Sequence, residues 1–177
     1  MTHATTVSAY GELIEPATVR IQRLLPGPIE RVWSYLTDSD LRAQWLARGD
    51  MPMQVGGKVE LVWRNDELSG RHEDRPEGVA EEQRMQCAVT RLDPPHLLAI
   101  SWGERGSEVT FELEPQGSEV MLTLTHRRLP DRSSLLGVSA GWHAHLDVLQ
   151  ARMREVAPPS FWKAWTGLRA EYDKRLP

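Results

Sequence analysis

Apolar and polar residues alternate along most of the chain between Gly56 and Leu124. A period of two places the apolar side chains of a strand on one face, so each run predicts a β-strand with one buried face. The runs are separated by segments such as Asp93-Pro94-Pro95 and Pro115-Gln116-Gly117, which are typical of tight turns. Short turns join antiparallel neighbours, because parallel strands need long crossovers. The residues that we expect on the buried face are Val59, Leu61, Trp63, Met85, Cys87, Val89, Leu98, Ile100, Trp102, Val109, Phe111, Leu113, Val120, Leu122 and Leu124.

Helical spacing flanks this region on both sides. A further strand is predicted over residues 18–24, and two short helices follow it, one after Pro28 and one carrying Trp45. After Leu129-Pro130-Asp131, apolar residues again recur every three or four positions, which predicts the longest helix of the chain. Its apolar stripe is Leu135, Val138, Trp142, Leu146, Leu149 and Met153. Pro158-Pro159-Ser160 ends this helix and begins a shorter amphipathic one.

This order of elements predicts an α+β domain. We expect a curved antiparallel sheet of about six strands wrapped around a long C-terminal helix, with two short helices after the first strand. The expected organisation is a leader over residues 1–16 that is flexible or packed at an edge, one domain over residues 17–157, and a helical extension over residues 158–177. The extension is expected to pack on the same domain or on a dimer partner. The polar segment from Arg64 to Glu82 predicts a long exposed loop.

Charge and composition exclude several classes of protein. The formal net charge is −4 and the pI is about 5.9, with scattered cations, whereas nucleic-acid binding usually needs a concentrated basic face. The single cysteine, Cys87, cannot form an internal disulfide and is interpreted as a small core residue. No apolar stretch reaches the ~18 residues of a membrane span, and the N-terminus lacks a signal-peptide pattern. We therefore expect a cytoplasmic protein with no nucleic-acid partner and no membrane span.

Four segments carry a resemblance to a known family. Residues Pro28–Trp33, followed by Trp45-Leu46, resemble the opening of the START-like (SRPBCC) superfamily, which includes birch-pollen-allergen-like proteins and polyketide cyclases. Three later segments are similar to the branch named after the activator of heat-shock protein 90 ATPase: Leu92–Leu98 leading into Ser101-Trp102, Leu122–His126, and Gly141–Leu146. The resemblance covers residues 18–156 in the correct order. It implies the helix-grip fold and a cavity for a small hydrophobic or amphipathic molecule.

The apolar faces of the predicted sheet and long helix nominate the residues that would line such a cavity. The seven tryptophans, against two phenylalanines, are the most unusual feature of the composition, and large flat side chains suit a cavity wall. Each residue could equally belong to a packed core, because lining and core look the same in a sequence. The predicted ligand-binding residues are Val59, Leu61, Trp63, Ile100, Trp102, Phe111, Leu122, His126, Trp142 and Leu146.

His126 is the candidate catalytic residue. It continues the apolar face of Leu122 and Leu124, so its side chain is predicted to point toward the long helix. A histidine there could orient a ligand carbonyl or transfer a proton near neutral pH. The alternative is a buried histidine that is hydrogen-bonded to the backbone or to the last helix.

His143, His145 and Asp147 raise the question of a metal site. Residues two apart on a helix point about 200° from each other, so only His143 and Asp147 share a face. We therefore expect no metal, and we interpret these residues as a solvated polar edge of the helix. No nucleophile elbow, phosphate loop or carboxylate pair is present in the sequence, and no cofactor is expected.

Three functions remain open at this point. The first is the binding of a small hydrophobic ligand without catalysis, which we favour. The second is a cyclase or hydro-lyase that uses the same cavity and His126. The third is a chaperone-associated protein-interaction module of the stress response, which would use exposed aromatic residues such as Trp162. The last helix is rich in aromatic residues, which leaves two alternatives open: a homodimer through this helix, or packing of the helix on its own domain.

Overall fold

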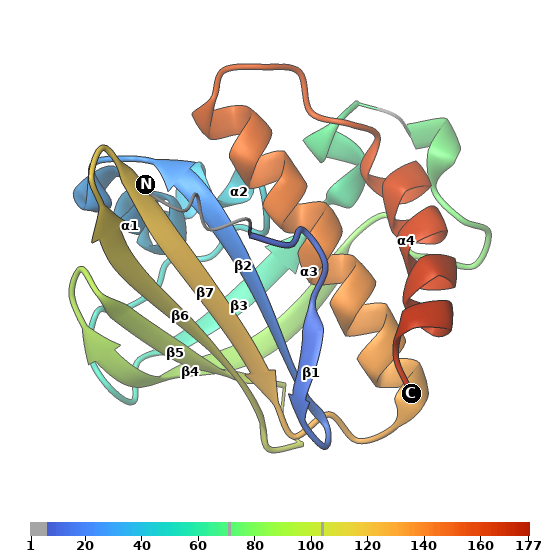
Figure 1. The fold of residues 1–177 in the computed structure, drawn as a ribbon, viewed down its shortest axis with the longest axis horizontal. Coiled ribbons are helices and arrows are strands. Elements are labelled where there is room, and N and C mark those ends of the chain that lie inside the picture. The colour runs from blue at the N-terminus through green and yellow to red at the C-terminus, as the bar shows by residue number, and fades with distance from the viewer. Residues whose placement is uncertain (1–6, 71, 104) are drawn as a thin grey trace, which may run out of the picture.

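A single antiparallel sheet of seven strands forms one layer of the molecule (Figure 1). The computed structural model describes residues 7–70, 72–103 and 105–177. The strands lie in the order β1-β2-β7-β6-β5-β4-β3, so β2 and β7 are the one pair of neighbours in this sheet that are not consecutive in the sequence. The bounds are β1 Glu12–Glu15, β2 Thr18–Pro26, β3 Lys58–Trp63, β4 Gln83–Asp93, β5 Leu97–Trp102, β6 Ser107–Gln116 and β7 Glu119–Arg127.

Helices cover the concave face of this sheet and close its ends. The two short helices are α1 (Ile29–Thr37) and α2 (Ser39–Ala43), and the long helix is α3 (Arg132–Met153). α3 packs against β2, and α4 (Phe161–Arg175) packs along the other side of α3 (Figure 1). The predicted helix-grip architecture is therefore confirmed, with one strand more than expected. α2 is shorter than predicted, because Trp45 and Leu46 follow its end as buried loop residues.

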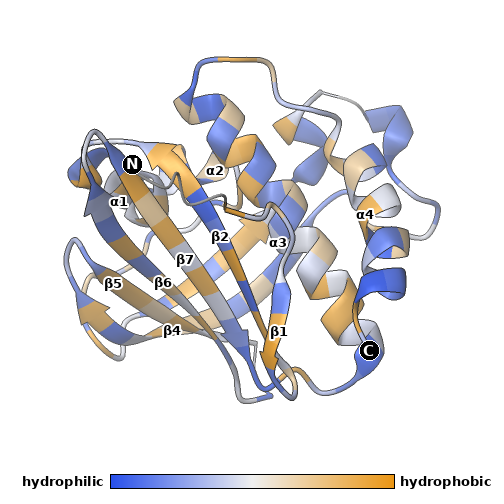
Figure 2. Ribbon diagram, in the orientation of Figure 1, coloured by the Kyte–Doolittle hydropathy of each residue, from blue (hydrophilic) through white to orange (hydrophobic). Residues whose placement is uncertain are grey.

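The core lies on the faces of the strands that the alternation in the sequence predicts to be buried. Figure 2 shows apolar and polar residues alternating along the strands. The register carries the inward-facing residues into rows across the sheet: Leu124 of β7 stands opposite Ile21 of β2 on one side and Phe111 of β6 on the other. All three are at most 2% exposed. Together with the apolar stripe of α3, these rows form the main core.

Of the two alternatives for the leader over residues 1–16, its described part shows packing at an edge of the sheet. Residues 12–15 form β1, an edge strand that pairs with β2. The segment before it is also held, because the backbone N–H of Gly11 donates to the hydroxyl of Tyr172 over 2.7 Å and Arg23 donates to the carbonyl of Ala9. Residues 1–6 lie outside the described residues. The sequence did not reveal β1 because the strand has only four residues and no buried alternation.

The expectation of a long exposed loop from Arg64 to Glu82 was wrong for its first part, where Asn65, Asp66 and Leu68 are buried. This segment contains two short 3₁₀ turns, η1 (Asn65–Leu68) and η2 (His72–Asp74), and η1 packs against α4. Asp66 is 2% exposed and binds the indole N–H of Trp162 over 2.7 Å, together with the side chains of Arg75 and His72. A buried carboxylate needs such partners, and they fasten the segment to the last helix.

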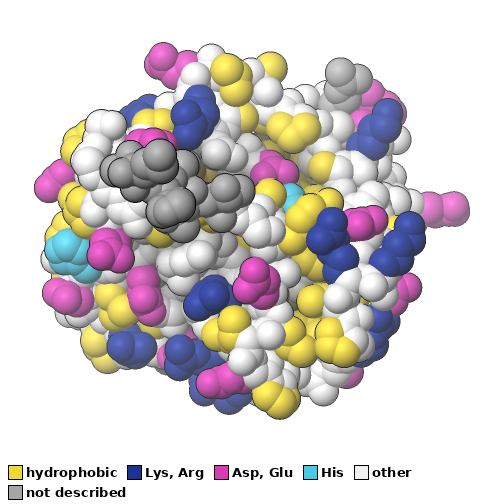
Figure 3. Space-filling model, in the orientation of Figure 1, with side chains coloured by type: hydrophobic (Ala, Val, Ile, Leu, Met, Phe, Trp, Pro, Cys, Tyr) yellow, Lys and Arg dark blue, Asp and Glu magenta, His cyan; other side chains and the backbone are white. Residues whose placement is uncertain are grey.

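Charges of both signs are mixed on the face of the molecule that Figure 3 shows, where Lys and Arg are interspersed with Asp and Glu. In the described part of the chain, no helix combines the length and the apolar character that crossing a membrane requires.

Arg42 fastens the turn that follows α2. Its side chain is 2% exposed and donates hydrogen bonds to the carbonyls of Leu36, Thr37, Ala47 and Gly49. Burial lowers the pKa of this guanidinium to about 10. One buried cation therefore satisfies four backbone acceptors that would otherwise lack a partner.

We expect Arg42→Met to lower the free energy of unfolding by about 3 kcal/mol, because four carbonyls lose their donor. Urea denaturation measures this change. Arg48→Met is the matched control, since Arg48 forms an exposed ion pair with Asp40, and such pairs contribute at most about 1 kcal/mol. Equal losses in the two variants would contradict the role given to Arg42.

Candidate functional site

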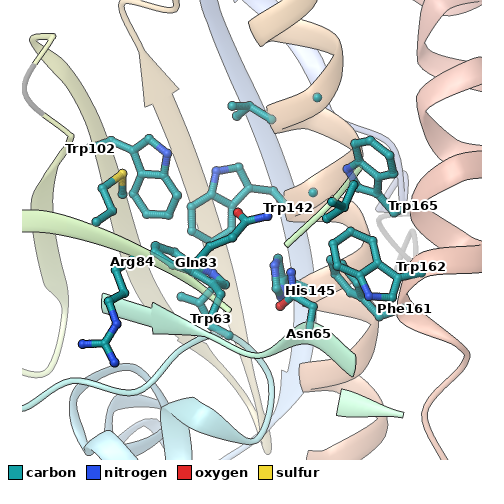
Figure 4. Close-up of a pocket in the computed structure, with 16 residues that line it drawn as sticks. Trp63, Asn65, Gln83, Arg84, Trp102, Trp142, His145, Phe161, Trp162 and Trp165 are labelled. Atoms are coloured by element: carbon teal, nitrogen blue, oxygen red, sulfur yellow. The ribbon is translucent and has the colours of Figure 1, made fainter. Parts of the chain in front are cut away.

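A cavity of about 400 Å³ lies between one edge of the sheet, α3 and α4. This volume is within the range of small-molecule sites, roughly 300–1,000 Å³. The sheet contributes the ends of β3, β4 and β5, and the η1–η2 segment contributes one further wall. The lining residues, drawn in Figure 4, are Leu46, Trp63, Asn65, Val79, Gln83, Arg84, Met85, Trp102, Gly137, Val138, Gly141, Trp142, His145, Phe161, Trp162 and Trp165.

Aromatic side chains dominate this lining, and five of the seven tryptophans of the chain belong to it. The centroids of successive rings are 4.5 to 6.4 Å apart, the spacing of offset and edge-to-face aromatic pairs. We call this set the aromatic arc. In spatial order it consists of Trp63, Trp102, Trp142, His145, Phe161, Trp162 and Trp165. Each ring is braced by its neighbours, which holds the wall in shape.

Two glycines leave space on the face of α3 that looks into the cavity. Gly137 and Gly141 are four residues apart, so they lie on the same side of the helix. A Cβ atom at either position would have no neighbour within 4 Å. Glycine inside a helix costs about 1 kcal/mol relative to alanine, so α3 is less stable than it could be at two positions where nothing forbids a side chain. The consequence is a wider cavity.

Two polar groups stand within the apolar lining. Asn65 is 9% exposed, and among the described residues its Oδ1 has no hydrogen-bond partner. His145 is 6% exposed, and its Nδ1 lies 2.8 Å from the carbonyl oxygen of Trp45. Burial lowers the pKa of His145 to about 4, so the ring is neutral at pH 7.

The rim of the cavity is formed by exposed residues of β4. Gln83 and Arg84 are exposed, whereas the tryptophans of α3 and α4 closest to the core are buried or half-buried. Arg84 is the one cation in the described lining, and its guanidinium is already bound by Glu60 and Glu82. The cavity therefore opens beside a neutralised charge.

The structure places His126 behind the cavity wall. Its side chain is fully buried, and the indole N–H of Trp142 donates to its Nδ1 over 3.0 Å. The ring also packs edge-to-face on Trp102, with centroids 5.5 Å apart. Burial lowers the pKa of His126 to about 4, so the ring is neutral. Of the two roles left open by the sequence, the geometry matches a buried histidine that orients a tryptophan of the long helix. A part in catalysis stays a prediction.

The predicted ligand-binding residues divide into two groups. Trp63, Trp102 and Trp142 line the cavity as drawn in Figure 4. The others lie in the packed core at 2% exposure or less and are not among the lining residues: Val59, Leu61, Ile100, Phe111, Leu122, His126 and Leu146. They share the inward face of the sheet or helix, but they stand closer to its middle, where side chains fill the space completely.

Sequence reasoning missed the part of the wall that comes from outside the sheet and the stripe of α3. Phe161, Trp162 and Trp165 belong to the helical extension, which is expected to pack on the same domain or on a dimer partner; Trp162 is 6% exposed and bound to Asp66 of its own chain. The aromatic spacing of α4 was a signal for a buried face, but the sequence does not say which element covers that face. Trp162 is therefore too buried to act as the exposed interaction residue suggested from the sequence.

The interpretation of His143 and His145 as a solvated edge was also wrong, because both are nearly buried. His143 lies 2.9 Å from the hydroxyl of Tyr172 and 3.5 Å from a carboxylate oxygen of Asp147, the residue predicted to share its face. Burial lowers the pKa of His143 to about 4 and raises that of Tyr172 to about 12. In the chain as described, no three His, Cys, Asp or Glu side chains are grouped to hold a metal ion.

An antiparallel sheet that grips a long helix and leaves an apolar cavity beside it defines the START-like class of ligand-binding folds. Within this class, the model of the family "Activator of Hsp90 ATPase homolog 1-like protein" matches residues 26–154. The chain therefore belongs to that family, and the resemblance read from its motifs is confirmed.

Solved structures share this fold over most of the chain. The solution structure of a Bordetella parapertussis protein is 40% identical, with a TM-score of 0.80 over 99% of this chain and 96% of that one. CalU16 from Micromonospora echinospora is 24% identical, with a TM-score of 0.65 over 89% of this chain and 86% of that one. DynU16, a protein of the dynemicin biosynthetic locus, is 23% identical, with a TM-score of 0.62 over 81% of this chain and 49% of that one. A comparison with curated proteins found no match.

The buried histidines predict a stability that falls in mild acid. His126, His143 and His145 each have a folded-state pKa of about 4, below the ordinary value of 6.5. Between these two values the unfolded chain binds protons that the folded chain excludes, so stability is complete above pH 6.5 and is lost as the pH falls toward 4. Each histidine adds a slope of up to about 1.4 kcal/mol per pH unit.

Urea denaturation between pH 6.5 and pH 5 measures that slope, in a range where most carboxylates are still ionised. His126→Asn is expected to reduce the slope by the contribution of one histidine, which is up to about 1.4 kcal/mol per pH unit. A free energy of unfolding that does not change over this range would show that the three rings do not stay neutral in the folded protein.

Proposed function

We propose that this protein binds a small, mainly aromatic molecule in the cavity bounded by the aromatic arc. The observation that carries the proposal is the combination of a 400 Å³ space with a wall that is mainly apolar and rich in aromatic rings. Tryptophan faces offer large contact areas at little cost in conformational entropy, and they stack well on flat rings. A location in the cytoplasm is part of the same proposal.

The two glycines of α3 support this function over simple core packing. A core gains stability from each methyl group that fills it, so a void beside Gly137 and Gly141 has no structural benefit. A bound molecule would recover the contacts that the empty space lacks. The fold shared with DynU16, which comes from a biosynthetic locus, also supports a small-molecule ligand.

Binding is favoured over catalysis because the candidate catalytic residue, His126, is not part of the cavity lining. His126 is separated from the cavity by Trp142, with which it shares a hydrogen bond. Protein interaction through the last helix is disfavoured because Phe161 and Trp162 are buried against the same domain. The aromatic residues that suggested a dimer surface are thus largely used within the chain.

Filling the cavity from its glycine face tests the proposal. Gly141→Leu places a branched side chain into open space beside the helix, so the fold is expected to remain intact. We expect the affinity for uncharged two- to four-ring aromatic compounds to fall at least about tenfold, because the ligand and the new side chain compete for volume. Tryptophan fluorescence quenching and thermal shift both measure the loss.

Gly167→Leu is the matched control, since Gly167 lies on α4, has equally open space at its Cβ, and is not part of the lining. It is expected to bind the compounds as the unaltered protein does. The proposal fails if no compound of the panel binds the unaltered protein, or if the two leucine variants bind equally well.

A further inference from the structure

The hydrogen bond made by His145 determines what its other nitrogen can do. A backbone carbonyl only accepts hydrogen bonds, so Nδ1 must carry the proton that it shares with the oxygen of Trp45. A neutral imidazole has one N–H, which leaves Nε2 with a lone pair and no proton. The ring belongs to the cavity lining, and Nε2 has no hydrogen bond to any described residue. The cavity thus contains a hydrogen-bond acceptor of fixed type.

Asn65 provides a second polar group in the lining of the cavity. It belongs to η1, is more than nine-tenths buried, and lines the same cavity as His145. Its Oδ1 is buried without a partner among the described residues. A buried acceptor that lacks a hydrogen bond costs about 1–3 kcal/mol, so the amide of Asn65 has hydrogen-bonding capacity that the fold leaves unused.

The charges around the cavity disfavour an anionic ligand. The lone pair of Nε2 would repel a carboxylate or phosphate placed against it. Arg84, at the rim, is engaged by Glu60 and Glu82 and offers no free positive charge to compensate. An anion would also lose its hydration on entering an aromatic wall, which is costly without a partner.

From these observations we infer that the cavity selects uncharged aromatic molecules that carry a hydroxyl group, and that this hydroxyl donates to Nε2 of His145. This inference rests on the proposed binding function and specifies its ligand class. The hydroxyl of a phenol both donates and accepts, so it can satisfy His145 and an amide atom of Asn65 together. The rest of the molecule stacks within the aromatic arc.

Four compounds of similar size separate the contributions. They are naphthalene, 2-naphthol, 2-methoxynaphthalene and 2-naphthoate, and each is titrated at pH 7 against the tryptophan fluorescence of the full chain. We expect 2-naphthol to bind about tenfold more tightly than its methyl ether, because the ether cannot donate to Nε2. The carboxylate is expected to bind more weakly than naphthalene.

His145→Phe tests the residue itself, because it retains a ring beside Phe161 and removes the acceptor. The preference for naphthol over its ether is expected to disappear, while naphthalene binds as before. His96→Phe is the matched control: Nδ1 of His96 also lies near a backbone carbonyl, that of Leu113, but His96 is outside this cavity. It is expected to keep the preference.

A second measurement needs no variant. In protein labelled with ¹⁵N at histidine, the Nε2 resonance of His145 is expected to move upfield on addition of 2-naphthol and to stay in place on addition of the ether. One outcome separates the inference from the proposed function. Naphthalene binds the unaltered protein and binds Gly141→Leu more weakly, but 2-naphthol and its methyl ether bind equally well and neither moves the Nε2 resonance. In that case the inference is overturned and the proposed function stands. If none of the four compounds binds, both are overturned.

Discussion

The width of the sheet is the constraint on which the site depends. Seven strands spaced about 4.8 Å apart span roughly 29 Å, whereas a helix with its side chains is about 10 Å across. α3 packs against β2, near one edge, and so cannot cover the apolar face that continues through β5, β4 and β3. The remaining surface has to be covered by other parts of the chain. Tryptophan side chains, α4 and the η1–η2 segment supply this cover, and they enclose a space that they do not fill.

Much of the fold could be predicted because its signals are local. Alternation between Val59 and Leu124 specified which face of each strand is buried, and the short turns specified antiparallel pairing. The same register argument selected Trp63, Trp102 and Trp142 as inward-facing, and these three do line the cavity. The register argument could not distinguish these cavity-lining residues from core residues such as Leu61 or Phe111. The two kinds differ in where they lie along the strand relative to α3, and that position is known only from the assembled fold.

The rest of the site arises from contacts between residues far apart in the sequence. The hydrogen bond from Trp162 to Asp66 joins positions separated by 96 residues, and that from His145 to the carbonyl of Trp45 joins positions separated by 100. Neither partner carries a local pattern that points to the other. Asp66 lies in a polar, charged segment, so burial was the less expected outcome for it. The sequence position of such a polar residue does not reveal its hydrogen-bond partner, which becomes evident only when the packing of α4 is known.

The contacts of Asp66 bear on how fast a molecule could enter and leave the cavity, as well as on the shape of the cavity. One buried carboxylate holds the indole of Trp162, Arg75 and His72, and the backbone N–H of Phe161 is held nearby by the hydroxyl of Ser69. These contacts join the wall formed by α4 to the wall formed by η1. For the proposed ligand, this means that a molecule larger than the rim would enter and leave only when these contacts break, so its residence time would report the local stability of the Asp66 cluster in addition to its affinity.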